Sequence, residues 1–314
     1  MMSARFLTVV LERAFNMRDG FGREIDYMRI SVIDSCNLNC YYCNPCDNNE
    51  HCHALNILSV KEVLCIVRAA TRLGIKHFRL TGGEPLLHPQ LDEMVLQIKK
   101  IPGVSSVSLT TNAVLLVQHA KWLKEAGIDS INVSLDTIDA SEYERITKKP
   151  LLEEVKHGIN AAIECGIRVK INVVLTPQTD VVALTRYVAK KGTDIRFIEM
   201  MPVGEGHTNG VEPYKKVIGT LSKLYGEPCR INTEKTKEIN SGNDKRKIPD
   251  NGPAEYYIFP ELGIRVGLIQ AIHGKFCDTC NRIRVTADGR LMPCLGSSVT
   301  MDLVPDSWDF ADDV

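Results

Sequence analysis

The chain has 314 residues, of which 44% are hydrophobic and 25% are charged, and its formal net charge is −1. This is an ordinary globular composition, long enough for one large domain or for one domain with an appendage. The near-neutral balance argues against bulk binding of nucleic acid, although it leaves room for a local basic pocket. No apolar run reaches the roughly 18 residues of a membrane span.

The N-terminus, MMSARFLTVVLERAF, has a short apolar stretch without a small-residue cleavage site, so we do not expect a secretory signal. Eleven cysteines in a chain of this kind indicate metal binding or catalysis and not disulfides. We therefore expect a cytoplasmic protein that contacts no membrane.

Six short, β-branched segments are predicted to be strands, and amphipathic helical stretches separate them. The strands are expected at 27–33, 75–80, 106–110, 130–135, 169–175 and 195–200. One helix is predicted to begin after Ser59, which forms a capping box with Glu62, and to end at Gly74. Two more helices end at Gly127 and Gly166. This alternation predicts a parallel sheet that is either doubly wound or curved into a barrel.

The motifs of this region follow the predicted strands. A cysteine loop comes after the first strand, TGGEP after the second and TTN after the third. No GxGxxG fingerprint is present after the first strand, which disfavours a Rossmann dinucleotide site. Functional groups of a curved βα sheet lie at the C-terminal ends of its strands, so we expect the site at that end of the sheet.

The pattern changes after about residue 202. A linker-like stretch, GEGHTNGVEP, is followed by a predicted helix at 212–225 and by an exposed polar loop at 232–252. Short strands and turns come next, which predicts a smaller α+β region. The expected organisation is an N-terminal extension over 1–22, a barrel over 23–210 and a C-terminal region over 211–314.

The first cysteine group, C-x3-C-x2-C, consists of Cys36, Cys40 and Cys43, with Tyr42 just before the last cysteine. Three thiolates leave one iron of a [4Fe–4S] cluster without a protein ligand, and that iron can bind a substrate or cofactor.

Two other kinds of site could use cysteines of this loop. A zinc site of Cys43, Cys46, Cys52 and His53 would have cramped spacing and would give Tyr42 no role. A ferredoxin-like register that begins at the second cysteine and includes Cys46 lacks the further x3-C-P that this pattern requires.

A second group near the C-terminus, C-x2-C-x13-C, consists of Cys277, Cys280 and Cys294. A zinc site completed by His273 is an alternative here. Arg282 and Arg284 lie on one face of the extended segment NRIR directly after the second cysteine of this group. Two guanidiniums are suited to an anionic or hydrogen-bonding ligand, which favours a binding site over a closed structural metal.

The first cysteine spacing, followed by GGEP after the second strand, resembles the radical S-adenosylmethionine (SAM) superfamily. In that superfamily the open iron chelates the amine and carboxylate of SAM, and reduction yields a 5′-deoxyadenosyl radical. The protein's task is then to bind and orient the reactants.

Further motifs resemble the GTP 3′,8-cyclase family, which begins molybdenum cofactor biosynthesis. They are, in chain order, DGFGREIDYMRISVIDSCNLNCYYC, FRLTGGEPLL, LTTN, INVSLDT, RFIEMMPVGEG, DNGPAEYY and FCDTCNRIRVTADGRLMPCL. The resemblance implies a partial (βα)6 TIM-like barrel, two [4Fe–4S] clusters and conversion of GTP to 3′,8-cyclo-7,8-dihydroguanosine 5′-triphosphate. The alternatives are a radical SAM enzyme that acts on a peptide or another substrate, and a non-catalytic metal scaffold.

Carried over residue by residue, the resemblance implies two sets of binding residues. The SAM-binding set is Tyr42, Gly83, Ser134 and Met201, and the GTP-binding set is Arg29, Arg79, Thr110, Lys170, Arg282 and Arg284. Three of the GTP-binding residues are cations inside otherwise apolar strands, where a charge is costly unless an anion meets it. Arg196 is a further candidate of the same type.

The resemblance also implies partner proteins, and the sequence departs from the family pattern in two places. A reductant protein, a downstream cyclic pyranopterin monophosphate synthase and a homodimer are the implied partners. Ala113 stands where the family pattern TTNG has glycine, and we expect only a local turn adjustment. The family usually continues to a Gly-Gly end, whereas this sequence stops after LVPDSWDFADDV, which fits truncation, divergence or reduced activity.

Overall fold

The computed structural model describes residues 17–43, 56–202, 210–231 and 252–303. All six predicted strands are present and parallel, and they lie side by side in chain order. They are β1 (Tyr27–Ser31), β2 (His77–Thr81), β3 (Ser106–Thr111), β4 (Ser130–Ser134), β5 (Val169–Leu175) and β6 (Asp194–Glu199). The expected partial barrel is therefore confirmed.

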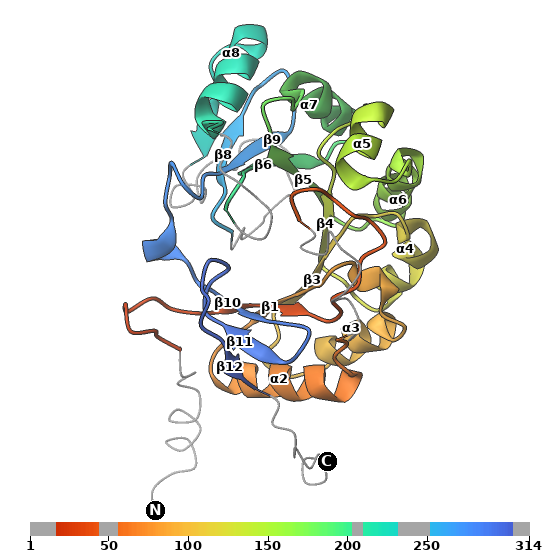
Figure 1. The fold of residues 1–314 in the computed structure, drawn as a ribbon, viewed down its shortest axis with the longest axis vertical. Coiled ribbons are helices and arrows are strands. Elements are labelled where there is room, and N and C mark those ends of the chain that lie inside the picture. The colour runs from red at the N-terminus through yellow and green to blue at the C-terminus, as the bar shows by residue number, and fades with distance from the viewer. Residues whose placement is uncertain (1–16, 44–55, 203–209, 232–251, 304–314) are drawn as a thin grey trace, which may run out of the picture.

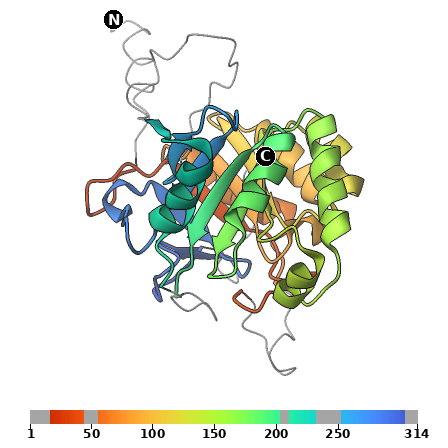
Figure 2. The same cartoon turned by 90° about the horizontal axis from the view of Figure 1, so that it is seen from above.

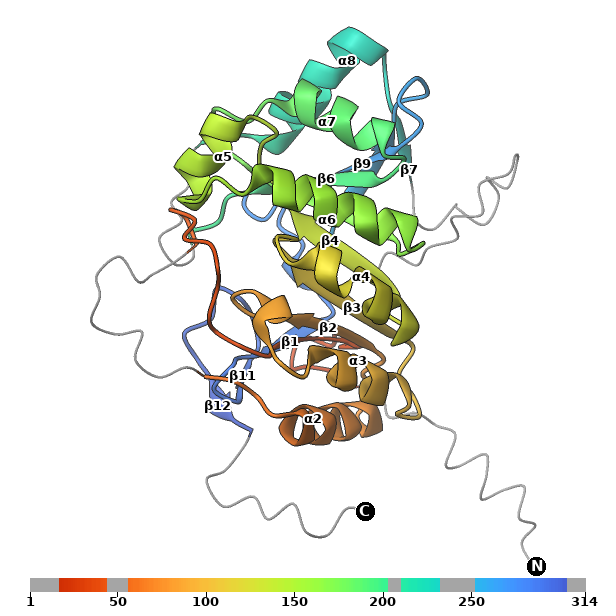
Figure 3. The same ribbon diagram turned by 90° about the vertical axis from the view of Figure 1, so that its right-hand side faces the viewer.

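Helices cover the outer face of this curved sheet, as Figures 1 and 3 show. They are α2 (Val60–Arg72), α3 (Leu91–Lys99), α4 (Leu116–Glu125), α5 (Ala140–Thr147), α6 (Leu152–Glu164) and α7 (Val181–Lys190), with a short 3₁₀ turn, η1 (Pro85–Leu87). The capping box before α2 is confirmed: Glu62 N–H donates to Ser59 Oγ at 3.3 Å, and Ser59 N–H donates to the Glu62 carboxylate at 2.7 Å.

The C-terminal strands continue the same sheet at both of its edges. These elements are η2 (Tyr214–Ile218), α8 (Gly219–Tyr225), β7 (Cys229–Ile231), β8 (Glu255–Ile258), β9 (Arg265–Ile269), η3 (Cys277–Thr279), β10 (Arg282–Val285), β11 (Arg290–Met292) and β12 (Met301–Asp302). Figure 2 shows the same fold from above. Strand β9 lies parallel to β6 at one edge, and β10 lies parallel to β1 at the other (Figure 1). Their sequence did not predict this pairing, and the predicted domain boundaries stay a prediction.

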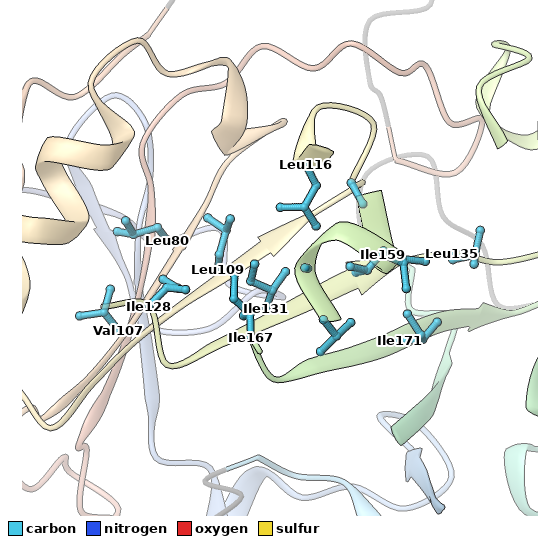
Figure 4. Close-up of a cluster of buried hydrophobic side chains, with 14 of the residues drawn as sticks. Leu80, Val107, Leu109, Leu116, Ile128, Ile131, Leu135, Ile159, Ile167 and Ile171 are labelled. Atoms are coloured by element: carbon cyan, nitrogen blue, oxygen red, sulfur yellow. The ribbon is translucent and has the colours of Figure 1, made fainter. Parts of the chain in front are cut away.

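Side chains alternate between the two faces of the sheet. Outward positions such as Leu80, Leu109 and Ile131 are fully buried against the helices, where they meet Leu116 of α4 and Ile159 of α6 (Figure 4). Inward positions are mostly polar, because successive residues of a strand point to opposite faces. The sheet therefore separates an apolar core on the outside from a polar interior.

Ala113, where the family pattern has glycine, has a left-handed backbone. Its φ is +66° and its side chain is fully buried, while its N–H donates to Thr111 Oγ1 at 2.9 Å. A Cβ on Gly158 would lie 2.3 Å from the Ala113 carbonyl oxygen, so this turn packs tightly against α6. The turn therefore keeps a left-handed conformation, which favours glycine, although alanine occupies the position.

The first prediction concerns this turn. Ala113→Gly should raise the free energy of unfolding by about 0.5–1 kcal/mol, because the left-handed penalty of about 1–2 kcal/mol exceeds the entropic cost of glycine. Urea denaturation measures the change. As a control, Ala126→Gly, at a right-handed position with φ −68°, should be destabilising. A lower stability of Ala113→Gly would show that the turn is not strained.

Candidate functional site

A cavity of about 420 Å³ occupies the inside of the barrel. Its size is in the usual range of small-molecule sites, which is about 300–1,000 Å³. Inward-facing residues of β1 to β6 contribute most of the wall, together with residues of β9 and β10. Of the predicted GTP-binding residues, five line it: Arg29, Arg79, Thr110, Lys170 and Arg282.

The cavity wall is strongly cationic. Six basic side chains line it: Arg29, Arg79, Arg168, Lys170, Arg196 and Arg282. The acidic side chain that lines it, Asp129, forms an ion pair with Lys99 at 2.9 Å. Cations this close together are costly to bury unless an anion enters, so the wall favours a polyanionic ligand.

Three arginines stand in one row across neighbouring strands. Arg29 of β1 is in register with Arg284 of β10 on one side and with Arg79 of β2 on the other. Burial, followed by the charge of Arg284, pushes the pKa of Arg29 well below its usual range. Its Nε has no hydrogen-bond partner within the described parts of the chain. Arg284 is not part of the cavity wall, but its register places it beside Arg29.

Arg79 is held in place before any ligand arrives. Its Nε donates to the hydroxyl of Tyr27, and its Nη1 donates to the Leu109 carbonyl at 3.1 Å and to Thr110 Oγ1 at 3.4 Å. Burial alone would raise the pKa of Tyr27, but the charges of Arg79 and Arg29 overcome that effect and lower it. The guanidinium is therefore preorganised within the wall.

Arg196, on the opposite side of the cavity, is positioned by its neighbours. Its Nε donates to Asn172 Oδ1 at 2.9 Å. A Cβ on Gly267, its register partner in β9, would lie 2.8 Å from the Arg196 side chain, so only glycine leaves room there. Lys170 Nζ lies 5.9 Å from the centre of the Tyr256 ring. The expectation that both cations face the barrel interior is confirmed.

The first cysteine group follows β1 at the C-terminal end of the sheet, as expected. Cys43 N–H donates to the Cys40 carbonyl at 3.0 Å, which folds the loop into a turn. Cys36 Sγ accepts from Leu38 N–H at 3.5 Å and from Asn112 Nδ2 at 3.8 Å. All three thiols are free, and burial raises the pKa of Cys40 to about 12. Within the described residues no group of three or more side chains converges on a metal position, so cluster binding by these thiols stays a prediction, and it would have to displace their protons.

The glycines of TGGEP serve a contact within the chain. Gly83 N–H donates to the Ile33 carbonyl at 2.8 Å, and a Cβ on Gly83 would lie 2.2 Å from the Ser35 carbonyl oxygen. Their close backbone approach is therefore to the segment just before Cys36. Glu84, fully buried, accepts from Thr111 Oγ1 and from Asn112 N–H, both at 2.7 Å.

Sequence reasoning missed Asp136, which lies just beyond β4. Its carboxylate accepts from the hydroxyl of Tyr42 in the cysteine loop and from Val174 N–H of β5 at 2.7 Å. Burial raises the pKa of Asp136 to about 6. The carboxylate therefore fixes the predicted SAM-binding tyrosine to the barrel. Asp136 is the aspartate of the motif INVSLDT, and that motif was the signal by which the sequence could have identified it.

The other predicted SAM-binding residues lie at or beyond the C-terminal ends of strands. Gly83 follows β2, Ser134 ends β4, and Met201 follows β6. Gly83 and Ser134 are exposed and Met201 is half-buried. They do not line the cationic cavity. Their role in SAM binding stays a prediction.

The second cysteine group lies at the β10 edge, next to β1. Cys277 begins η3, Cys280 directly precedes the NRIR segment and Cys294 follows β11. All three thiols are free. Burial and the charge of Arg282 lower the pKa of Arg284, while Cys294 and Cys280 act to raise it. His273, the candidate zinc ligand, contacts the carboxylate of Glu199 instead.

Two family profiles match the chain. The Radical SAM superfamily matches residues 30–184, and Molybdenum Cofactor Synthesis C matches residues 193–306. A GTP 3′,8-cyclase of Clostridium perfringens strain SM101 is 37% identical over 282 residues, which cover 89% of this chain and 83% of that protein. A GTP 3′,8-cyclase of Pelotomaculum thermopropionicum is 38% identical over 294 residues, covering 91% of this chain and 86% of that one.

Solved structures share the fold. Streptococcus suis SuiB bound to S-adenosylmethionine has a TM-score of 0.63 at 14% identity, and the match covers 88% of this chain and 63% of SuiB. Native anSMEcpe with bound AdoMet has a TM-score of 0.58 at 18% identity, covering 87% and 75%. No helix in the described part of the chain is long and apolar enough to cross a membrane.

The second prediction assigns the first cysteine group. Reconstituted wild-type protein should hold about eight irons per chain, and Cys36→Ala should hold about four, because one [4Fe–4S] cluster loses a ligand. The same variant should lose SAM cleavage. Iron analysis and detection of 5′-deoxyadenosine by chromatography measure both effects.

Two controls accompany that variant. Cys65→Ala, on α2, should keep both iron and SAM cleavage. Cys46 lies outside the described residues, and Cys46→Ala should also keep both. Loss of iron from Cys46→Ala would favour the ferredoxin-like register, and SAM cleavage by Cys36→Ala would contradict the assignment.

Proposed function

Because the chain belongs to the GTP 3′,8-cyclase family of the radical SAM superfamily, we propose that it converts GTP to 3′,8-cyclo-7,8-dihydroguanosine 5′-triphosphate. This reaction begins molybdenum cofactor biosynthesis. Its cofactors are SAM and two [4Fe–4S] clusters, one for each cysteine group. The observation that carries the proposal is the cationic cavity inside a barrel that has one cysteine group after β1 and the other beside β10.

In this proposal the triphosphate lies among the cavity cations. Arg29 has an unpartnered Nε, Arg196 has an unpartnered Nη2 within the described residues, and both face the cavity. Phosphate oxygens are strong acceptors that pair well with guanidiniums. Arg79 and Thr110 are already joined by a hydrogen bond, so they would present a fixed donor pair to the nucleotide.

The guanine end lies toward the second cysteine group in this proposal. Arg282 lines the cavity, and Arg284, two residues further along β10, is in register with Arg29 of β1. A base bound there would meet two guanidiniums and the open iron of the second cluster. Tyr42, Gly83, Ser134 and Met201 would hold SAM at the C-terminal strand ends, above the cavity.

If bound at the first cluster, SAM would supply, for one electron from the reductant, the radical that removes the ribose 3′ hydrogen as 5′-deoxyadenosine. Closure of the C3′–C8 bond would leave an unpaired electron on the base, and a second electron from the reductant and a proton would complete the 7,8-dihydro product. The protein's residues bind and orient the two reactants for this step. Asp136 and Glu84 contribute by fixing the cysteine loop and its neighbours to the ends of the strands.

A peptide substrate fits the cavity less well. A peptide-binding groove would present backbone partners along a sheet edge or an apolar surface. This cavity presents six basic side chains on the inside of a sheet. The likeness to SuiB and anSMEcpe concerns the fold alone.

The remaining partners follow from the proposed reaction. A reductant protein must deliver the electron that cleaves SAM, and a cyclic pyranopterin monophosphate synthase would use the product. A homodimer is part of the same proposal. None of the nine described cysteines is in a disulfide, which supports a reducing compartment such as the cytoplasm.

Anaerobic incubation of the reconstituted protein with SAM, dithionite and GTP tests the function. We expect 5′-deoxyadenosine and a cyclised GTP product in equal amounts by mass spectrometry. Replacement of GTP by ATP should abolish the cyclised product. Cluster-loaded protein that yields no cyclised nucleotide would contradict the proposal.

The third prediction concerns the arginines beside the second cysteine group. Arg282→Ala and Arg284→Ala should each weaken GTP binding roughly ten- to a hundredfold, because a charge-assisted hydrogen bond contributes about 1.5–3 kcal/mol. Calorimetry measures GTP and SAM binding separately, and SAM affinity should stay unchanged. Arg290→Ala, which removes an exposed arginine of β11, is the matched control. Equal GTP affinity in all four proteins would contradict the substrate role of this segment.

The fourth prediction concerns His77, which lines the cavity and contacts Ser106 Oγ at 2.8 Å. Burial lowers the pKa of His77, Lys76 lowers it further, and Asp26 and Asp129 oppose them. The imidazole is therefore neutral at neutral pH and gains a positive charge as the pH falls.

Bound triphosphate should favour that charge, so wild-type GTP affinity should rise from about pH 8 to about pH 5.5 more than that of His77→Gln. The difference should be up to about tenfold for a pKa change of about one unit. Titration of the nucleotide's own phosphate affects wild type and His77→Gln equally, so it cancels in the ratio of their GTP affinities. Parallel pH profiles would show that His77 does not face the ligand.

A further inference from the structure

The turn at residues 19–23 lies before β1 and contacts the second cysteine group. Arg23 Nη1 donates to the Cys277 carbonyl at 2.6 Å, across 254 positions of sequence. Asp19 holds this arginine from the other side, because Arg23 Nε donates to its carboxylate at 2.6 Å and Nη2 pairs with the same oxygen. One guanidinium therefore joins the turn to the first residue of the cysteine segment.

The turn itself is well ordered by hydrogen bonds. The Asp19 carboxylate accepts from the N–H groups of Phe21 and Arg23 at 2.9 and 3.0 Å, and Asp19 N–H donates to the Arg23 carbonyl at 3.1 Å. The Arg23 side chain lowers the pKa of Asp19, so this carboxylate is ionised at neutral pH. The guanidinium thus projects from a closed turn and not from a free chain end.

Two further contacts tie the same region to the other end of the cysteine segment. Asn281 Nδ2 donates to Asp26 Oδ1 at 2.6 Å, and Tyr27 N–H donates to the Asn281 carbonyl at 3.2 Å. Asn281 directly follows Cys280, and β10 then pairs with β1. The segment that carries Cys277 and Cys280 is therefore held at both of its ends by residues that precede or begin β1.

We propose that Asp19 and Arg23 form a clamp that positions Cys277 for the second cluster. Arg23 is a positioning residue in this proposal, because it contacts a carbonyl of the cysteine segment and no reacting atom. An exposed 3₁₀ turn such as η3 has few contacts of its own, so a fixed carbonyl limits how far its thiols can separate. Nothing in the spacing of the cysteines indicates this contact.

The planar fork of arginine is needed for this geometry. Nε and Nη2 face the Asp19 carboxylate while Nη1 faces the Cys277 carbonyl, and a single ammonium cannot reproduce these three directions. Arg23→Lys should therefore keep the charge and lose most of the clamp. Arg18 offers a matched control next to the same turn, because its side chain pairs with Glu24 at 3.2 Å and is 67% exposed.

The proposal rests on the proposed function only in that the second cysteine group holds a cluster. The full chain with Cys36, Cys40 and Cys43 all replaced by alanine leaves that cluster as the source of bound iron. In this background, iron should leave to a chelator about tenfold faster from Arg23→Gln and Arg23→Lys than from the parent or from Arg18→Gln. A tenfold effect corresponds to about 1.4 kcal/mol.

Hydrogen exchange of the metal-free full chain gives a second readout that does not need iron. Amides of residues 276–281 should exchange several times faster in Arg23→Gln, while those of β3 to β5 keep their wild-type rates. Unchanged exchange and chelation rates would overturn the proposal. Faster exchange spread equally over β3 to β5 would overturn it as well, because the turn would then support the whole fold. A parent that binds no iron would contradict the second cluster itself.

Discussion

The structure depends on cations held on the inner face of a curved sheet whose outer face is apolar. Leu80 and Leu109 point outward into the helical layer, while Arg79, the residue before Leu80 in β2, points inward. This alternation follows from the pleat of a strand, so the same residues that build the core also fix the direction of the charges. The parallel register then aligns Arg284, Arg29 and Arg79 in one row.

Two of the inward cations are held by neighbouring groups before a ligand binds. Tyr27 and the Leu109 carbonyl hold Arg79, Asn172 holds Arg196, and a glycine in β9 leaves space for Arg196. Arg29 differs, because part of its guanidinium lacks a partner among the described residues and its pKa is driven down by burial. A polyanion relieves this cost, which links the stability of the empty cavity to its preference for a nucleotide.

Local pattern in the sequence predicted the six strands, the capped helix after Ser59 and the placement of the first cysteine group after β1. Cations inside β-branched segments also predicted the basic interior. The contacts that sequence did not predict are long-range: 94 positions separate Tyr42 from Asp136, and 254 separate Arg23 from Cys277. The pairing of β9 with β6 and of β10 with β1 also joins segments far apart in the sequence, and the sequence did not predict it. Polar residues at every second position, such as Ser106 and Ser108, were a usable signal for the cavity wall.

The central claim is that the cationic barrel holds GTP with its ribose 3′ hydrogen facing the SAM-derived radical. Transfer of label from GTP deuterated at the ribose 3′ position into 5′-deoxyadenosine tests this claim most directly. The account predicts that mass spectrometry finds one deuterium in the 5′-deoxyadenosine formed by the cluster-loaded protein. Formation of 5′-deoxyadenosine without deuterium, in the presence of bound labelled GTP, would contradict it.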